Sequence, residues 1–587
     1  MASLMRNLTR GLLLSALLTH LAVAQGVVDV SLTAAPGTVD LGPGFAAEPA
    51  WLYGGSLPGQ VIRATQGQTL RVRFRNNLPE TTTVHFHGQP SINGMDGMEV
   101  MSRPAVAPGQ EFRYELRNLA SGTYWFHPHS SMHHEQLDVG LHGVLIVDPP
   151  NPALDPQFDL EQVVVLDDWT ATRTGGTYNG HLLNGKTSLG QSGISVQPGQ
   201  RLRLRFVNVS ATTNYVVALD GHPLTVTHTD GNRIQPVTVQ AIPIGIGERY
   251  DAIVDCTNPG VWSLAVSTIQ NRTATVVRGV VRYAGQTGAD PAPTFVPPNL
   301  ASGALLDYLQ LASYWPVTTP ITATPNRTYP VALGMQMQSP GVMGFTINGQ
   351  LYPNVTPFVV ADGEVVQLNL TTSTPGMMML HPMHMHGHFV RLMGTAGGTT
   401  HPPIKDTILV QRAGQPGSSW SVQFTADNPG NWLYHCHDMM HMMNGMMTRI
   451  EYVGDADGDA IASAVDLEAT RDWPVLTVSD QSAAFAPGGV GAVSLQWQPS
   501  QWFLLYGSLA ELPLPSVQPP YGELQVSNFG LSQLGVGVTA ANGIGTWPYA
   551  IPADPGLVGF RIVLQALVGT SLPGGMRLST DQAITIR

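Results

Sequence analysis

The chain has 587 residues, which is too many for one hydrophobic core, so three or four domains are expected. Only 12% of the residues are charged, the formal net charge is −12, and glycine (63) and proline (46) are abundant. The acidic balance and the lack of basic tracts argue against a nucleic-acid-binding protein.

The first 24 residues have the features of a secretory signal. Arg6 and Arg10 precede the apolar run GLLLSALL, and the small residues AVA end at Ala24. This pattern predicts a signal peptide over residues 1–24 and a secreted or periplasmic mature protein. No later segment has the roughly 18 apolar residues needed to cross a bilayer, so no transmembrane segment is expected.

Short stretches of alternating apolar and polar residues follow, separated by turn-forming clusters. TLRVRFRNN (69–77) and RLRLRFVNV (201–209) are examples, and this alternation predicts strands of β-sandwiches. Three longer segments, 58–88, 194–224 and 355–388, resemble one another in the order of strand, glycine turn and alternating strand. Three copies of one sandwich are therefore expected over most of residues 26–453.

Proline-rich segments suggest where these copies meet. They lie at 148–156 and from 285 to 328, and they predict domains over 25–150, 151–325 and 326–453. Residues 454–587 contain almost no histidine, and their alternating runs predict an acidic linker and a small C-terminal β-domain of unknown role. The fold class is therefore all-β.

The start of this last region carries a candidate calcium site. Asp455, Asp457, Asp459 and Asp466 occupy positions 1, 3, 5 and 12 of a calcium-loop pattern. The glycine of the pattern is displaced, because Ala460 stands at position 6. An acidic linker without a metal is the alternative.

Histidines are concentrated in His-x-His pairs in the first and third copies, and the middle copy has no such pair. Residues i and i+2 of a strand point to the same face, so each pair can present two imidazoles together. Neutral imidazole suits Cu, Zn, Fe and Ni, which makes a metal site the favoured interpretation over buried structural histidines. The four pairs are His85/His87, His127/His129, His384/His386 and His435/His437.

Cys436 lies inside the last pair and favours copper. A thiolate, two imidazoles and a weak thioether form a trigonal blue-copper site. His381 and His441 can supply the imidazoles, and Met446 is the candidate for the long axial contact. Zinc is the alternative metal, but a four-ligand zinc site would leave the other pairs unused. The other cysteine, Cys256, is expected to be a free buried thiol.

The motifs HFHG, HPH, HPMHMHGH and HCHDMMHMMNGMM resemble, in order, the four copper motifs of the multicopper oxidases, the family of laccases and of cuprous or ferrous oxidases. The resemblance covers about residues 26–453. It implies three cupredoxin-like Greek-key domains and four copper ions: one type 1, one type 2 and two type 3. It further implies that the cluster of three coppers lies between the first and third domains.

The resemblance also implies a role for each candidate ligand. His85 and His384 would bind type 2 copper, while His381, Cys436, His441 and Met446 would bind type 1 copper. His388 matches a histidine that is not a ligand. Type 3 copper would be held by His87, His127, His129, His386, His435 and His437.

Protons for O2 reduction require an acid, and Asp96 resembles the family acid near type 2 copper. An ordinary turn aspartate is the alternative interpretation. Many bacterial members carry a glutamate directly after the last type 1 histidine, but this chain has Met442 there. A second carboxylate is therefore either missing or supplied from elsewhere.

The resemblance predicts an enzyme in which Cys436 receives electrons one at a time and passes them to O2, which is reduced to water. The donor is either a phenol or aromatic amine, or Cu(I) or Fe(II).

Of 22 methionines, 15 lie between residues 331 and 447, and they either pack the core, line a donor pocket or bind Cu(I). The alternatives to an oxidase are a copper-sequestering protein without turnover and a copper nitrite reductase. The sequence does not define an oligomeric state.

Overall fold

The computed structural model describes residues 26–99, 101–130, 133–170, 174–339, 342–372 and 379–453, together with ten strands between 475 and 585. The structure is almost entirely β, as predicted. None of its described helices is both long and apolar enough to span a membrane. The predicted signal peptide (1–24) and the candidate calcium residues Asp455, Asp457, Asp459 and Asp466 lie outside the described residues.

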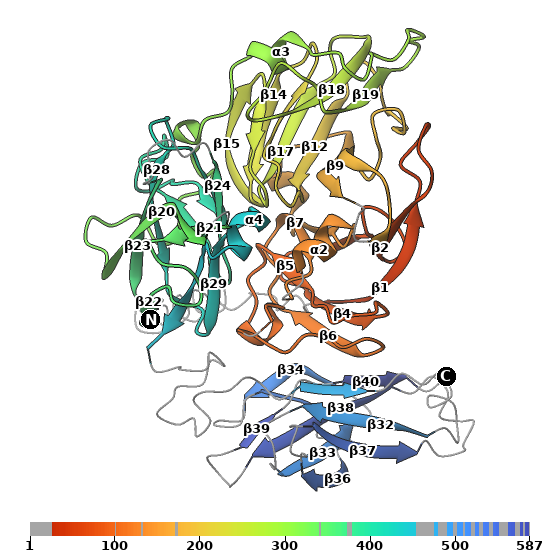
Figure 1. The fold of residues 1–587 in the computed structure, drawn as a ribbon, viewed down its shortest axis with the longest axis vertical. Coiled ribbons are helices and arrows are strands. Elements are labelled where there is room, and N and C mark those ends of the chain that lie inside the picture. The colour runs from red at the N-terminus through yellow and green to blue at the C-terminus, as the bar shows by residue number, and fades with distance from the viewer. Residues whose placement is uncertain are drawn as a thin grey trace, which may run out of the picture.

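The first group of strands, red to orange in Figure 1, forms two four-stranded sheets with orders β2-β1-β4-β6 and β3-β8-β7-β5. A 3₁₀ helix η1 (Asn93–Met95) and a helix α2 (His133–Asp138) interrupt the strands. The strands are β1 (Val27–Val39), β2 (Glu48–Tyr53), β3 (Val61–Thr65), β4 (Thr69–Asn76), β5 (His85–His87), β6 (Glu111–Leu116), β7 (Gly122–His127) and β8 (Gly143–Asp148).

The second group, yellow to green, follows the 3₁₀ helix η2 (Pro152–Leu154). Its sheets have the orders β10-β9-β12-β17-β14-β15 and β11-β19-β18-β13-β16. Helix α3 (Pro298–Ser302) and η4 (Tyr308–Gln310) come after it. The strands are β9 (Leu160–Thr170), β10 (Asn179–Leu183), β11 (Ile194–Val196), β12 (Arg201–Asn208), β13 (Tyr215–Leu219), β14 (Leu224–Thr229), β15 (Asn232–Val239), β16 (Ile242–Ile244), β17 (Arg249–Asp255), β18 (Val261–Thr268) and β19 (Val277–Tyr283).

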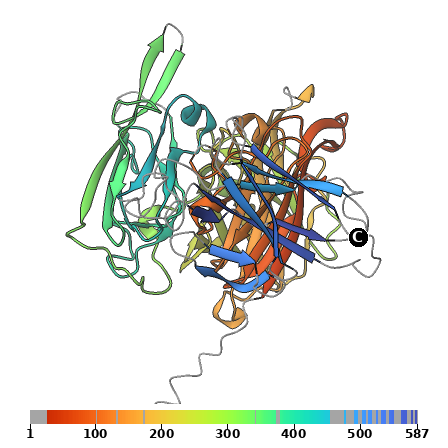
Figure 2. The same cartoon turned by 90° about the horizontal axis from the view of Figure 1, so that it is seen from below.

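The third group, green to cyan, has sheets of order β21-β20-β23-β28-β25-β26 and β22-β30-β29-β24-β27, with the short helix α4 (Met439–Met443) between β29 and β30. The β20–β21 hairpin projects from this group in Figure 2. The strands are β20 (Arg327–Ser339), β21 (Val342–Ile347), β22 (Phe358–Val360), β23 (Val365–Thr372), β24 (His381–Met385), β25 (Val390–Leu392), β26 (Ile404–Lys405), β27 (Thr407–Val410), β28 (Ser419–Thr425), β29 (Asn431–Cys436) and β30 (Met447–Tyr452).

The three groups share one strand order, which confirms the repeat predicted from the sequence. In each first sheet a hairpin is followed by a parallel pair, β1·β4, β9·β12 or β20·β23. In each second sheet a parallel pair, β3·β8, β11·β19 or β22·β30, leads to two further antiparallel strands. Strands β5 and β7 thus correspond to β13 and β18 and to β24 and β29.

Apolar packing between the paired sheets holds each group together, with a large core cluster in each. Strands β4 and β23 alternate between buried and half-buried residues, as their sequences predict. Strand β12 departs from this expectation, because its polar residues Arg203 and Arg205 are also buried. Both arginines form ion pairs with Asp251, which compensates for their removal from water.

The C-terminal strands confirm the predicted β character of this region. They lie on the side of the first group that carries β6 (Figure 1) and form separate sheets, β31-β32-β37, β36-β33-β38-β39 with β40, and β34-β35. The strands are β31 (Val475–Val478), β32 (Val490–Gln496), β33 (Trp502–Ser508), β34 (Glu511–Val517), β35 (Glu523–Val526), β36 (Ser532–Val538), β37 (Ile544–Ala550), β38 (Arg561–Gly569), β39 (Met576–Leu578) and β40 (Gln582–Thr585).

Candidate metal centres

The histidine pairs lie on equivalent strands of the first and third groups or span the ends of those strands. In the first group, β5 pairs with β7, so that His85 faces His127 across the ladder. In the third group, β24 pairs with β29, so that His384 faces His435. The equivalent strands of the second group, β13 and β18, carry no histidine. One strand pair used twice therefore presents imidazoles from two domains.

These imidazoles meet in one buried cluster, which we call the junction cluster. The His87 and His384 rings stack with centroids 3.7 Å apart, and the His85 and His386 rings stack at 4.0 Å. Each member is at most 3% exposed. The junction cluster consists of His85, His87, His127, His129, His384, His386, His435 and His437.

Several ring nitrogens in the cluster have lone pairs suited to a metal ion. Nε2 of His85, Nδ1 of His87 and Nε2 of His384 are buried without a hydrogen-bond partner, while the other nitrogen of each ring is engaged. Nε2 of His386 and Nε2 of His435 face each other at 3.3 Å. A single ion could be held by both of them.

Burial favours the neutral form of His384 and His386. It lowers the pKa of His386 to about 4 and the pKa of His384 well below its usual value. The neighbouring histidines lower the pKa of His384 further. Neutral imidazoles at this density form a donor set that fits several transition-metal ions.

Asp96 lies at the edge of the junction cluster, directly after η1. Its Oδ2 is 2.8 Å from Nδ1 of His386, and its backbone carbonyl accepts a hydrogen bond from Nδ1 of His85 at 2.8 Å. Burial raises the pKa of Asp96, but the interactions with His386 and His85 outweigh burial and hold it well below its usual range. The structure therefore places Asp96 against two histidines of the junction cluster, as an ionised carboxylate rather than a solvated turn residue.

A second carboxylate, Asp406, also contacts the junction cluster, and the sequence analysis missed it. Its Oδ1 lies 3.1 Å from Nε2 of His87, and its carbonyl accepts from Nδ1 of His384 at 2.9 Å. Asp406 is 1% exposed. The available signal was a Lys-Asp pair at the start of the apolar run TILV, since charges inside a buried strand need partners.

A separate group, which we call the cysteine site, comprises His381, Cys436 and His441. Sγ of Cys436 lies 3.4 Å from Nδ1 of His441 and 3.9 Å from Nδ1 of His381. All three side chains are buried, and burial lowers the pKa of His441 to about 4. Burial, together with the charge of Asp438, raises the pKa of the Cys436 thiol well above its usual value. A bound metal would therefore have to displace the thiol proton.

Met446 lies beside the cysteine site in the core of the third group. It is fully buried, and its carbonyl accepts a hydrogen bond from the Cys436 amide at 3.0 Å. Helix α4 brings His441 toward the thiol, because Asp438 caps the helix and accepts from the amides of Met440 and His441.

The methionines of α4 divide between core and surface, as expected for a short helix. Met439 and Met442 are buried, whereas Met440 is 55% and Met443 is 44% exposed. Met440 lines a pocket of about 570 Å³ that also contains His441. The other side chains that line this pocket include Met343, Met379, Phe345 and Asp438.

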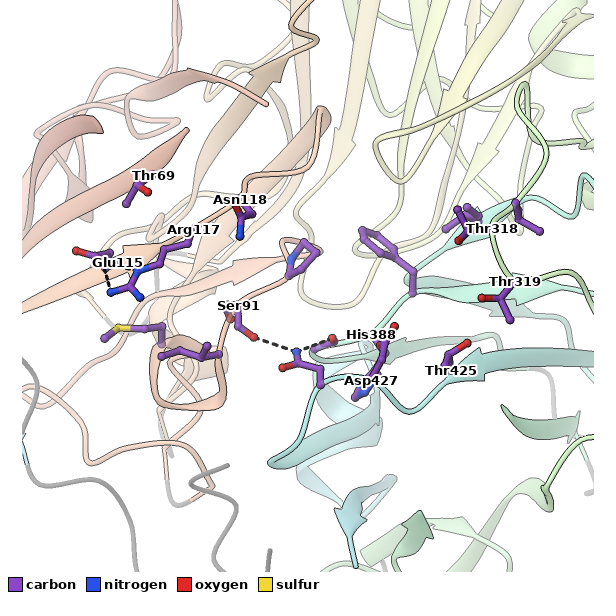
Figure 3. A pocket seen from close by; sticks show the side chains of 18 of the residues that line it. Thr69, Ser91, Glu115, Arg117, Asn118, Thr318, Thr319, His388, Thr425 and Asp427 are labelled. Carbon is purple, nitrogen blue, oxygen red and sulfur yellow. Dashed lines mark hydrogen bonds and ion pairs between the residues drawn. The ribbon is translucent and has the colours of Figure 1, made fainter. Parts of the chain in front are cut away.

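A different opening leads toward the junction cluster. A pocket of about 830 Å³ lies between Thr69, Arg117 and Asn118 of the first group and Thr425 and Asp427 of the third, with Thr319 from the segment that precedes β20 (Figure 3). It shares lining residues, including His388 and Phe389, with a narrow cavity that His85 and His386 also line. This opening is lined by residues other than those of the pocket beside the cysteine site.

The expectation for Cys256 is confirmed. Cys256 is a free, buried cysteine, and Cys436 is likewise free. Both ring nitrogens of His388 have protein partners: Nε2 lies 2.7 Å from the hydroxyl of Tyr452, and Nδ1 lies 3.2 Å from the carbonyl of His386.

Comparisons with known proteins agree with this geometry. Three family models, each described as multicopper oxidase, match residues 39–152, 160–286 and 323–455. The multicopper oxidase MmcO of Mycobacterium tuberculosis is 33% identical over 472 residues, covering 73% of this chain and 87% of the relative. Laccase-4 of Trametes villosa is 27% identical over 465 residues, covering 69% and 86%.

Solved structures give the same result. A multi-copper oxidase from Pseudomonas thermotolerans aligns with a TM-score of 0.56 and 26% identity, covering 73% of this chain and 99% of the other. Fet3p, described as a multicopper oxidase that functions in iron import, aligns with a TM-score of 0.62 and 21% identity, covering 73% and 90%. At that identity, the second likeness supports the fold alone.

Proposed function

The chain belongs to the multicopper oxidase family, and from this premise we propose which residues hold its copper and how they work together. As a member, it is an oxidase that takes electrons from a reducing substrate and uses O2 as acceptor. The observation that carries the proposal is the convergence of eight buried imidazoles beside a thiol whose two sequence neighbours belong to that same cluster.

We assign one copper to the cysteine site and three to the junction cluster. His381, Cys436, His441 and Met446 would hold the type 1 ion. His85 and His384 would hold the type 2 ion, and the other six histidines would hold the type 3 pair. The unpartnered nitrogens of His85, His87 and His384 fit this assignment, as does the approach of Nε2 of His386 to that of His435. Calcium at Asp455, Asp457, Asp459 and Asp466 stays a prediction.

Bound copper supplies the one-electron storage and the O2 reduction, and the protein supplies the path and the protons. Cys436 is bonded through the backbone to His435 and His437, so electrons arriving at its thiolate have a short covalent route to the junction cluster. Asp96 holds the position from which a proton can reach the cluster. Four electrons and four protons convert one O2 into two waters.

The domain and cellular assignments are part of the same proposal. Cupredoxin-like domains span 25–150, 151–325 and 326–453, and 454–587 comprises a linker and the C-terminal β-domain. A signal peptide over 1–24 would export the chain to the periplasm or the medium.

For the donor we propose Cu(I), taken up in the pocket beside His441. Three thioethers, those of Met343, Met379 and Met440, line this pocket together with the carboxylate of Asp438. Soft thioether ligands select Cu(I) over harder ions. The volume of about 570 Å³ and the Phe345 ring would also admit a phenol, which is the second candidate donor.

Metal analysis with an oxygen electrode tests the proposal. The expected result is about four coppers per chain and O2 uptake that depends on the donor, with Cu(I) oxidised more efficiently than a phenol or Fe(II). Copper binding without O2 uptake would instead indicate a sequestering protein. A preference for phenols would overturn the donor assignment and leave the oxidase assignment intact.

A further inference from the structure

The second domain contributes no histidine to the junction cluster, yet its backbone closes one side of it. Gly247 lies between β16 and β17 with φ +84°, and a Cβ at this position would lie 2.9 Å from Cε1 of His87 and 3.1 Å from Cδ2 of His437. Only a glycine allows the main chain to approach the imidazoles this closely.

Arg249, two residues after Gly247, belongs to the second domain and contacts residues of the first and third domains on this side of the cluster. Its two terminal nitrogens donate to the two carboxylate oxygens of Asp406 at 2.7 and 2.6 Å. Its Nε donates to the carbonyl of Thr123 in the first domain at 3.1 Å. Arg249 is fully buried, and this two-pronged geometry fixes the carboxylate in orientation as well as in position.

Asp406 in turn fixes two rings of the junction cluster. Its Oδ1 lies 3.1 Å from Nε2 of His87, and its carbonyl lies 2.9 Å from Nδ1 of His384. Donation at these atoms keeps the proton on the outer nitrogen of each ring. The inner nitrogens, Nδ1 of His87 and Nε2 of His384, are the ones without partners. An acceptor behind a metal-binding histidine selects the tautomer in this way.

The neighbouring Lys405 ties the same strand to the second domain. Its ammonium lies 2.9 Å from Asp230 and 2.9 Å from Glu248, both buried. The backbone amides of Asp406 and Thr407 donate to Oδ2 of Asp230 at 3.2 Å each. This group contains three carboxylates and two cations, so its formal charge is −1. The carboxylates are Asp230, Glu248 and Asp406, and the cations are Arg249 and Lys405. The group lies beside a site that collects cations.

We propose that the copper-free second domain is part of the oxygen-reducing site, with Arg249 and Asp406 as positioning residues that hold His87 and His384 in their metal-binding tautomers. This inference rests on the proposed function of the junction cluster. It predicts that disturbing Arg249 alters the junction coppers while the cysteine site is unaffected.

The test compares Arg249→Lys with Arg203→Lys in the full-length, copper-loaded protein. Arg203 is a matched control, because it is a buried arginine of the same domain and is ion-paired to Asp251. The histidine that it approaches, His228, is not a member of the junction cluster. In both variants a lysine ammonium replaces a guanidinium that donates through two nitrogens, to Asp406 in the case of Arg249 and to Asp155 and Asp251 in the case of Arg203, and the positive charge is kept. The readouts are the electron paramagnetic resonance spectrum of the type 2 copper, copper retained against a chelator, and the visible absorption of the copper–thiolate.

For Arg249→Lys, the expected result is a changed type 2 spectrum and junction-copper affinity reduced roughly 10- to 100-fold, with the thiolate absorption retained. Arg203→Lys should keep both the spectrum and the affinity. An unchanged spectrum and affinity in Arg249→Lys, or equal changes in both variants, would overturn the inference. Wild-type protein that shows no type 2 spectrum would overturn the proposed function instead.

Asp406→Asn provides a second variant if Arg249→Lys does not fold. The amide retains the size of the side chain and removes the charge that faces His87. A shift in the type 2 spectrum of Asp406→Asn is expected, and a wild-type spectrum would contradict the positioning role.

Discussion

The cysteine site and the junction cluster are neighbours in sequence but are built in different ways. The cysteine site lies within the third domain and adjoins a pocket lined by methionines. The junction cluster takes four histidines from each of two domains and its wall from the remaining one. Donor specificity can therefore vary with local surface residues, whereas O2 chemistry depends on the assembly of all three domains.

The largest effect should come from Cys436→Ser, which removes the only residue that belongs to one site and connects covalently to the other. Oxidase activity should fall to background, and the copper–thiolate absorption should disappear. Metal analysis should show that the junction coppers remain. Loss of all copper would show that the two sites do not form independently.

Asp96→Asn should slow O2 reduction at the junction cluster and leave the cysteine site unchanged. Removing a positioned proton-transfer group costs roughly 10²- to 10⁴-fold in rate. Reduction of the cysteine site by the donor under anaerobic conditions should keep its wild-type rate, because the histidines that Asp96 contacts belong to the junction cluster. Stopped-flow absorption at the cysteine site distinguishes these steps, and slowed anaerobic reduction would contradict the assignment.

Acid should destabilise the copper-free protein. The pKa values of His386 and His441 lie near 4 in the folded protein, against 6.5 for the unfolded chain. Between these values the unfolded chain binds more protons, so this contribution to stability is complete above about pH 6.5 and is lost as the pH falls toward 4. Each such histidine contributes about 3 kcal/mol.

Urea unfolding of the copper-free protein at several pH values in this window measures the effect. The junction cluster should account for more of the slope than the cysteine site, because it holds more buried imidazoles. His386→Gln should therefore flatten the pH dependence. If the free energy of unfolding of His386→Gln depends on pH as strongly as that of the wild type, burial does not hold His386 neutral.

The smallest effect is expected at the donor pocket. Met440 and Met443 are both exposed on α4, but only Met440 lines the pocket beside His441. Met440→Leu should raise the KM for Cu(I) severalfold with little change in kcat, and Met443→Leu should change neither. Equal behaviour of the two variants with Cu(I) would remove the support for a thioether pocket.

Much of this architecture was predictable because local patterns determine it. Period-two alternation identified the sandwich strands, and the His-x-His spacing identified the paired imidazoles, although three of the four pairs extend past the end of their strand. The roles of Asp406 and Arg249 were not predictable, because they depend on contacts between residues more than 150 positions apart, such as the 157-residue separation of this ion pair. Likewise, the alternation of β12 indicated a solvated face, but the ion pairs of Arg203 and Arg205 bury it.

The ratio of donor oxidised to O2 consumed tests the central claim most directly. Electrons that enter at the cysteine site and collect in the junction cluster should give four Cu(I) oxidised per O2, with no hydrogen peroxide released. Two Cu(I) per O2 with stoichiometric peroxide would contradict the account, because it would place O2 reduction outside the junction cluster.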